Sequence, residues 1–185
     1  MRLFIALTPG ERMRDALVGL QREFARRGVG GSFTRRENLH LTLAFIGEYG
    51  DPEAVRRVME GVPFEPFALA LEGVGAFGDL FWAGLAPCGA LERYVARLRR
   101  ALAGAGIPFD RKRFSPHFTL VRGAGGARIP PVAPLRAECE TGFVSLFRSD
   151  RGKSGMIYTE LARAECPRKN GGPGEDRGRT AVPRR

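Results

Sequence analysis

The chain of 185 residues is predicted to be an α+β protein whose two similar lobes face each other across a groove. One reason is that strand-like and helix-like patterns alternate along most of its length. Another is that a strand, a helix and a strand carrying the tetrad His-x-Thr-Leu follow one another twice. The spacing is also alike, since Leu3 stands 37 residues before His40 and Phe81 stands 36 residues before His117. Repetition of this kind is typical of a duplicated unit.

The first repeat begins with a strand followed by a helix. Apolar residues dominate Arg2–Leu7, and the next four residues, Thr8-Pro9-Gly10-Glu11, have the pattern of a capping box with threonine as N-cap and proline at N1. We therefore expect a helix over 9–27. A strand is expected over 39–46, and Asp51 is expected to cap a second helix.

The second repeat contains the same kinds of element. Alternation of apolar residues predicts strands, and apolar residues at helical spacing predict one helix. The strands are expected over 67–74, 80–85 and 117–122, the helix over 91–103, and two final strands over 138–147 and 156–162.

Composition and charge favour an anionic partner. The formal net charge is +10 and comes almost wholly from arginine, although a chain rich in Arg, Ala, Gly and Pro can reach such a charge without a binding role. Residues 167–185 are nearly devoid of apolar side chains, so we expect a single domain over 1–166 and a disordered basic tail over 167–185. The apolar run Leu3–Leu7 is too short for a signal sequence or a membrane span, which predicts a cytoplasmic protein.

The cysteines do not have the spacing of a metal site. Cys88, Cys139 and Cys166 are far apart, with no CxxC pair and no Cys/His cluster. We interpret them as reduced structural thiols. Neither a metal nor a cofactor is expected.

Each of the two histidines begins a tetrad in which a threonine follows two residues later. Because residues i and i+2 of a strand share a face, His40 and Thr42 should lie on one face of their strand. Phe45 should lie on the other, in the hydrophobic layer, although an aromatic ring there could also stack on a base. The same alternation places His117 with Thr119.

Two histidines with neighbouring hydroxyl groups suit general acid and base catalysis. An imidazole titrates near neutral pH, so one can accept a proton while the other donates one, as cleavage of a phosphodiester requires. The threonine hydroxyls can donate to phosphate oxygens where charge develops. A single His-x-Thr would more often be a buried structural histidine, but the duplication favours catalysis.

These motifs resemble those of the 2H phosphoesterase superfamily, and specifically its LigT-like RNA 2′,3′-cyclic phosphodiesterases, formerly called 2′-5′ RNA ligases. The resemblance extends over about residues 1–162. It rests on the opening Arg2–Leu7, on Asn38–Gly47 around the first tetrad, on Trp82–Leu85, and on Phe114–Arg122 around the second. The resemblance implies a bilobal fold with two antiparallel sheets flanked by helices around a central cleft.

The resemblance also implies a reaction, the hydrolysis of a terminal RNA 2′,3′-cyclic phosphate to a 2′-phosphate without a metal. His40 would be the proton donor to the departing 3′-oxygen and His117 the proton acceptor from water. Thr42 and Thr119 would hold the phosphate. Arg122 stands where the family has an arginine that contacts phosphate, but strand alternation turns it away from the histidine face unless a bulge re-aims it.

The expected substrates are RNA with 2′,3′-cyclic phosphate ends, including tRNA fragments, or small cyclic nucleotides. No membrane partner is expected, and we expect a monomer. One alternative is the joining of RNA ends through a 2′-5′ linkage by the reverse reaction, which water should outcompete unless a second RNA end is bound. The other is an RNA-binding module without catalysis.

Overall fold

The computed structural model describes residues 1–133, 137–153 and 155–165, so Cys166 and the predicted tail over 167–185 lie outside the described residues. The strands are β1 (Arg2–Leu7), β2 (Ser32–Phe33), β3 (Leu41–Glu48), β4 (Phe67–Phe77), β5 (Leu80–Leu85), β6 (His117–Arg122), β7 (Glu138–Thr141), β8 (Phe143–Gly152) and β9 (Gly155–Glu165). The helices are α1 (Glu11–Arg26), α2 (Pro52–Glu60) and α3 (Gly89–Gly104), and a 3₁₀ turn spans Arg36–Asn38.

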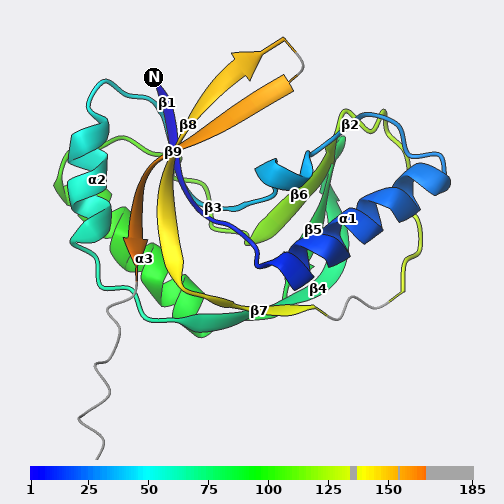
Figure 1. Ribbon diagram of the computed structural model, residues 1–185, viewed down its shortest axis with the longest axis horizontal. Coiled ribbons are helices and arrows are strands. Elements are labelled where there is room, and N and C mark those ends of the chain that lie inside the picture. The colour runs from blue at the N-terminus through cyan, green and yellow to red at the C-terminus, as the bar shows by residue number, and fades with distance from the viewer. Residues whose placement is uncertain (134–136, 154, 166–185) are drawn as a thin grey trace, which may run out of the picture.

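The strands pair antiparallel in the order β7-β4-β5-β6-β3-β1-β8-β9, with β2 beside β6. The sheet is curled, and it divides between β3 and β6, whose recorded pairing is Leu41 with Phe118. The two halves curve apart from that point and form the two lobes (Figure 1). The predicted bilobal α+β fold is therefore confirmed, with its two sheets joined at the motif strands.

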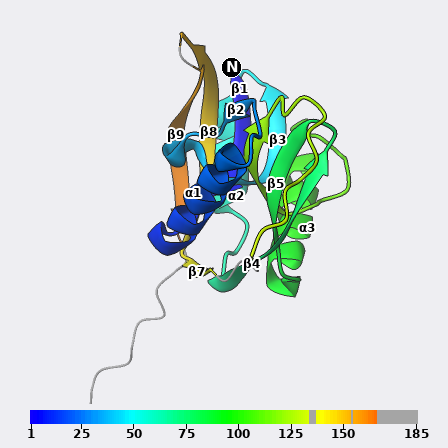
Figure 2. The same ribbon diagram turned by 90° about the vertical axis from the view of Figure 1, so that its right-hand side faces the viewer.

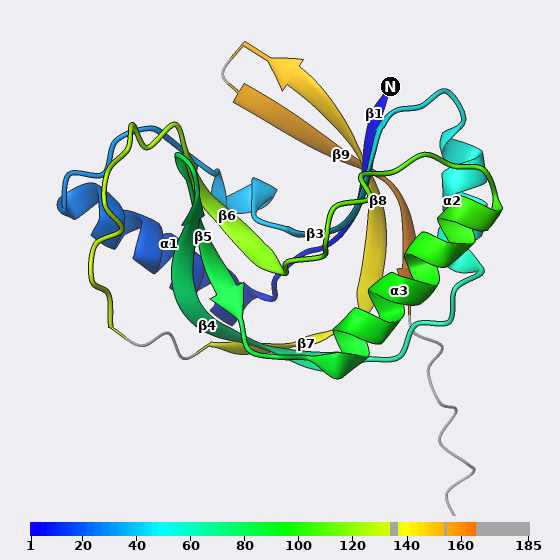
Figure 3. The same ribbon diagram turned by 180° about the vertical axis from the view of Figure 1, so that it is seen from behind.

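Helices α1 and α3 each pack in the lobe opposite to that of the strand they follow. Helix α1 follows β1 in the chain but packs against β6 and β7, whereas α3 follows β5 but packs against β3 and α2. Figure 1 and Figure 3 show α1 beside β4–β6, with α2 and α3 together on the other lobe. One hydrophobic cluster accordingly extends through both lobes; it includes Leu3, Phe24, Val55, Leu98 and Phe118.

The predicted start of the first helix is wrong. Helix α1 begins at Glu11, with Gly10 as N-cap and no side-chain cap, so the capping box at Thr8 does not form. The carboxylate of Glu11 instead pairs with Arg14 and Arg36. By contrast, the Asp51 carboxylate does cap α2, accepting a hydrogen bond from the Ala54 amide at 3.0 Å.

The strand predicted over 138–147 is in fact two strands in different lobes. Strand β7 pairs with β4, and after Gly142 the chain continues as β8, which pairs with β1. The alternation of apolar and polar residues along one segment does not show where the neighbouring strand that pairs with it changes. Within the described residues, no helix is both long and apolar enough to cross a membrane.

Candidate active site

The two motif strands meet at equivalent residues. Strands β3 and β6 pair antiparallel through the residue that follows each histidine. His40 directly precedes β3 and His117 is the first residue of β6, so the two histidines flank this pairing. The fold brings both predicted motifs to one point in the cleft.

The backbone holds both imidazole rings in the same way. Nδ1 of His40 lies 2.7 Å from the carbonyl oxygen of Asn38, and Nδ1 of His117 lies 2.7 Å from that of Ser115. Because a carbonyl oxygen can only accept, each Nδ1 carries a hydrogen. Nε2 is then the nitrogen that can exchange a proton with a substrate.

Aromatic side chains contact the ring of His40 in the lobe that contains β1, β3, β8 and β9. The ring centroid lies 4.9 Å from that of Phe4 and 5.2 Å from that of Tyr158. Phe4 itself stacks on Phe147 at 5.3 Å. These rings cover much of the imidazole, and the side chain of His40 is only partly exposed to solvent.

His117 has corresponding supports on the second lobe. Its ring centroid lies 5.2 Å from that of Phe77 and 6.2 Å from that of Trp82. Gly75 makes this arrangement possible, since a Cβ there would lie 2.1 Å from the Trp82 ring. Phe4 and Trp82 occupy matching places, each one residue after the apolar residue that marks the start of its repeat.

Burial lowers the pKa of both histidines. The pKa of His40 falls from 6.5 to about 4, mainly through desolvation and further through the positive charges of Arg122 and His117; the hydrogen bond to Asn38 opposes the shift. Desolvation and Arg122 also lower the pKa of His117, against the hydrogen bond to Ser115. His40 is therefore neutral at neutral pH in the free protein.

The low pKa of His40 predicts a loss of stability in acid. A group whose folded pKa lies below its unfolded value stabilises the protein fully above the unfolded pKa, here 6.5, and this contribution is lost as the pH falls toward about 4. A shift of this size corresponds to roughly 3 kcal/mol. Between pH 7 and pH 4, the wild type should lose up to that much more unfolding free energy than His40→Gln, as measured by urea denaturation. Parallel curves for the two proteins would contradict the prediction.

A β-bulge in β6 brings Arg122 to the histidine side of the strand. The register between β5 and β6 skips Leu120, so that Leu120 and Val121 are both fully buried in succession. Alternation shifts by one residue, and Arg122 emerges on the face of His117. Its charge then acts on both histidines. The bulge that is needed for Arg122 to face the histidine side is therefore present in β6.

Strand β3 has the same irregularity at the corresponding place. Its register with β1 skips Leu43, and Leu43 and Ala44 are both buried. Phe45 therefore turns to the histidine side, where the Arg2 guanidinium lies 5.0 Å from its ring centroid. Phe45 packs against the hydrophobic cluster of Phe4, Ala6 and Phe147, but on the histidine side of β3. The predicted face is therefore wrong, because simple alternation does not allow for the extra residue.

A pocket of about 450 Å³ opens beside His117 and Thr42. Its walls combine aromatic rings with cationic side chains. They include Phe45, Phe77, Phe114, Arg99, Lys112 and Arg113. Sequence reasoning did not single out Phe77 or Arg99, because nothing in a linear pattern brings β4 or α3 to this cleft.

Arg99 of α3 connects the two motif segments. It donates from Nε to the carbonyl of Leu43 at 3.1 Å, where the β3 bulge leaves that oxygen available, and from Nη1 to the carbonyl of Lys112 at 2.9 Å. The Arg99 guanidinium also lies 5.4 Å from the ring centroid of Phe114, which stands three residues before His117. The floor of the pocket is thus tied to the segment that leads to His117.

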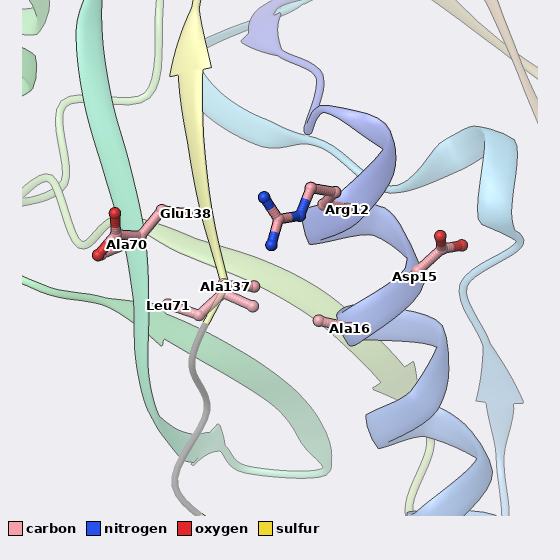
Figure 4. Close-up of a pocket in the computed structure, with 7 residues that line it drawn as sticks. All are labelled: Arg12, Asp15, Ala16, Ala70, Leu71, Ala137 and Glu138. Carbon is pink, nitrogen blue, oxygen red and sulfur yellow. The ribbon is translucent and has the colours of Figure 1, made fainter.

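A larger hollow lies away from the histidines. It has a volume of about 720 Å³ and is bounded by Arg12 and Asp15 of α1 and by Leu71 and Glu138 on the β4–β7 side (Figure 4). None of its described lining residues is a histidine. The described ranges also contain no group of three or more His, Cys, Asp and Glu side chains suited to a metal ion.

Fold and site together define a mixed α/β phosphoesterase with a duplicated histidine motif. The family described as LigT like Phosphoesterase matches residues 7–81, which include the first motif. A protein of Aeropyrum pernix named RNA 2′,3′-cyclic phosphodiesterase is 30% identical over 165 residues, covering 80% of this chain and 94% of that protein. The chain therefore belongs to the LigT-like phosphoesterase family.

Solved structures agree with this membership. A structure from Thermus thermophilus is 30% identical, with a TM-score of 0.76 and coverage of 89% of this chain and 97% of that one. Escherichia coli LigT in complex with 3′-AMP is 25% identical, with a TM-score of 0.78 and coverage of 89% and 97%.

Proposed function

We propose that this protein hydrolyses terminal RNA 2′,3′-cyclic phosphates to 2′-phosphates. The observation that carries the proposal is the pair of imidazoles, each held through Nδ1 and each leaving Nε2 for the substrate, on strands that meet at equivalent residues. Relatives that bear the name RNA 2′,3′-cyclic phosphodiesterase support it. The nucleotide bound to the related LigT structure supports it as well.

In this reaction one imidazole acts as base and the other as acid. Nε2 of His117 accepts a proton from water, and the water oxygen forms a bond to phosphorus. The bond from phosphorus to the 3′-oxygen breaks, and the proton on Nε2 of His40 passes to that oxygen. The product retains its phosphate on the 2′-oxygen.

The donor role of His40 requires that substrate change its protonation. With a pKa of about 4, His40 is neutral at pH 7 in the free protein. A phosphate anion in the cleft is an opposite charge at close range, and it raises the pKa of a neighbouring imidazole. As substrate binding raises its pKa, Nε2 of His40 takes up a proton from solvent, and this is the proton that the reaction uses.

Three further residues are proposed to bind the phosphate. The hydroxyls of Thr42 and Thr119 donate to its non-bridging oxygens. Arg122 provides a guanidinium whose paired N–H groups match two phosphate oxygens. The pocket beside His117 would hold the base, with Phe45 as a stacking surface.

Product analysis on a panel of 2′,3′-cyclic phosphate substrates tests the proposal. The panel runs from mononucleotides to tRNA halves, because each of these carries the same reacting group. We expect 2′-phosphate ends as the main product. A 2′-5′-joined RNA exceeding that product would favour end joining, and RNA binding without turnover would favour a non-catalytic module.

The reaction is expected to proceed without a metal ion. Two imidazoles can transfer both protons, and Arg122 can offset the phosphate charge. Turnover should therefore be unchanged, within about twofold, after dialysis against EDTA. Loss of turnover that added Mg²⁺ or Zn²⁺ restores would contradict this mechanism.

A further inference from the structure

The β8–β9 hairpin continues past the sheet as a two-stranded ribbon, formed by residues 149–153 and 155–159. Strand β8 pairs with β1 over Ser145–Arg148, whereas its pairing with β9 continues to Gly152 and Gly155. The ribbon projects beyond the body of the protein (Figure 1 and Figure 2). An isolated hairpin is only marginally stable in water, so the contacts that hold the ribbon are informative.

The ribbon is attached to the segment that carries His40. Nδ2 of Asn38 donates to the carbonyl of Met156 at 2.8 Å. The carbonyl of the same Asn38 accepts the hydrogen bond from His40. Tyr158 of the ribbon also contacts the imidazole ring of His40. The ribbon thus begins beside the reacting group and leads away from it.

One face of the ribbon is directed to the same side as His40. Tyr158 pairs across the strands with Ser149, and Met156 pairs with Arg151. Residues paired across two strands, and residues two apart along one, share a face. Arg151 therefore lies on the face of Tyr158, farther from His40. Lys153 follows at the tip.

The cations of the ribbon are not neutralised by nearby acids. Asp150 binds Arg148 at 2.7 Å, and no carboxylate in the described part of the chain pairs with Arg151 or Lys153. Arg14 of α1, by contrast, is paired with a glutamate.

We propose that Arg151 and Lys153 of the ribbon bind backbone phosphates of the RNA chain that ends in the cyclic phosphate. This inference rests on the proposed function for the nature of the ligand. A terminal phosphate held at His40 leaves the adjoining chain free to follow the ribbon. Cationic side chains that replace the counterions of those phosphates strengthen binding in a salt-dependent way. The enzyme would accordingly prefer oligonucleotides to mononucleotides.

Binding of a product RNA measures this directly and needs no turnover. The probe is a 5′-fluorescein RNA of ten nucleotides that ends in a 2′-phosphate, followed by fluorescence anisotropy at several salt concentrations. The double variant R151A/K153A should bind about tenfold more weakly at low salt. The slope of log affinity against log salt should fall by about 1.4, since each single-strand phosphate contact contributes roughly 0.7.

The matched control is R93A/R100A, which removes two exposed arginines from α3, away from the ribbon (Figure 3). Equal changes in both double variants, or an unchanged slope in R151A/K153A, would overturn the inference. The ratio of kcat/KM for a cyclic phosphate oligonucleotide to that for the mononucleotide should also fall about tenfold in R151A/K153A. If wild type turns over neither substrate, the proposed function fails, while the binding result still decides the role of the ribbon.

Discussion

Replacing His40 or His117 with asparagine is expected to lower kcat on a 2′,3′-cyclic phosphate end by about 10²-fold or more. The asparagine amide can still donate to the backbone carbonyl two residues earlier, as Nδ1 does in the wild type. It lacks Nε2, which is the group that transfers the proton. The experiment therefore separates the chemical role of each histidine from its structural hydrogen bond. Single-turnover kinetics on a short RNA provides the measurement.

The double variant His40→Asn/His117→Asn provides a check on this mechanism. Groups that act in one concerted step are not additive, so removing both should cost little more than removing one. Thermal unfolding of each variant shows whether the fold is retained. Undiminished turnover in either folded single variant would exclude the two-histidine mechanism.

Arg122→Ala is expected to lower kcat/KM by roughly 10² to 10³, the range for losing one preorganised donor to developing charge. Arg122 also depresses the pKa of both histidines. Its removal should therefore raise the pKa of His40 above about 4, although desolvation, which is the larger cause of the shift, keeps it below 6.5. A pH titration followed by NMR measures this pKa. The chain has two histidines, and the spectra of His40→Asn and His117→Asn assign the two imidazole signals.

Two control variants, Arg122→Lys and Arg100→Ala, test whether the effect of Arg122→Ala comes from loss of the guanidinium at this position. Lysine keeps the charge but not the planar fork, so the lysine variant should lose less activity while the pKa of His40 stays low. Arg100 is an exposed arginine of α3, and its loss should change neither quantity. If Arg122→Ala leaves both the activity and the pKa of His40 unchanged, Arg122 is not a ligand of the site.

Much of the site could be predicted from local sequence. The strand 117–122 and the strand 80–85 have the bounds that their apolar patterns indicate. The partnership of His40 with Thr42, and of His117 with Thr119, follows from alternation over three residues, which no distant contact needs to specify. The duplication was evident because the marked residues recur at nearly equal spacing.

Other features required knowledge of the partner strands. Whether Arg122 and Phe45 reach the cleft depends on bulges, and a bulge exists only relative to the register of a neighbouring strand. The change of lobe at Gly142 and the place of Arg99 between the motifs likewise depend on contacts between distant segments. For the same reason the pKa of His40 could not be anticipated, since it depends on what encloses the ring.

The sequence by itself determined the two His-x-Thr devices, their strand context and the duplicated order of elements, because backbone alternation and helical periodicity act over a few residues. The tertiary structure alone decided that the motif strands meet at equivalent residues, that two matching bulges turn Phe45 and Arg122 into the cleft, and that a ribbon adjoins His40. These features are set by pairing and burial between segments far apart in the chain, where no local pattern specifies the partner.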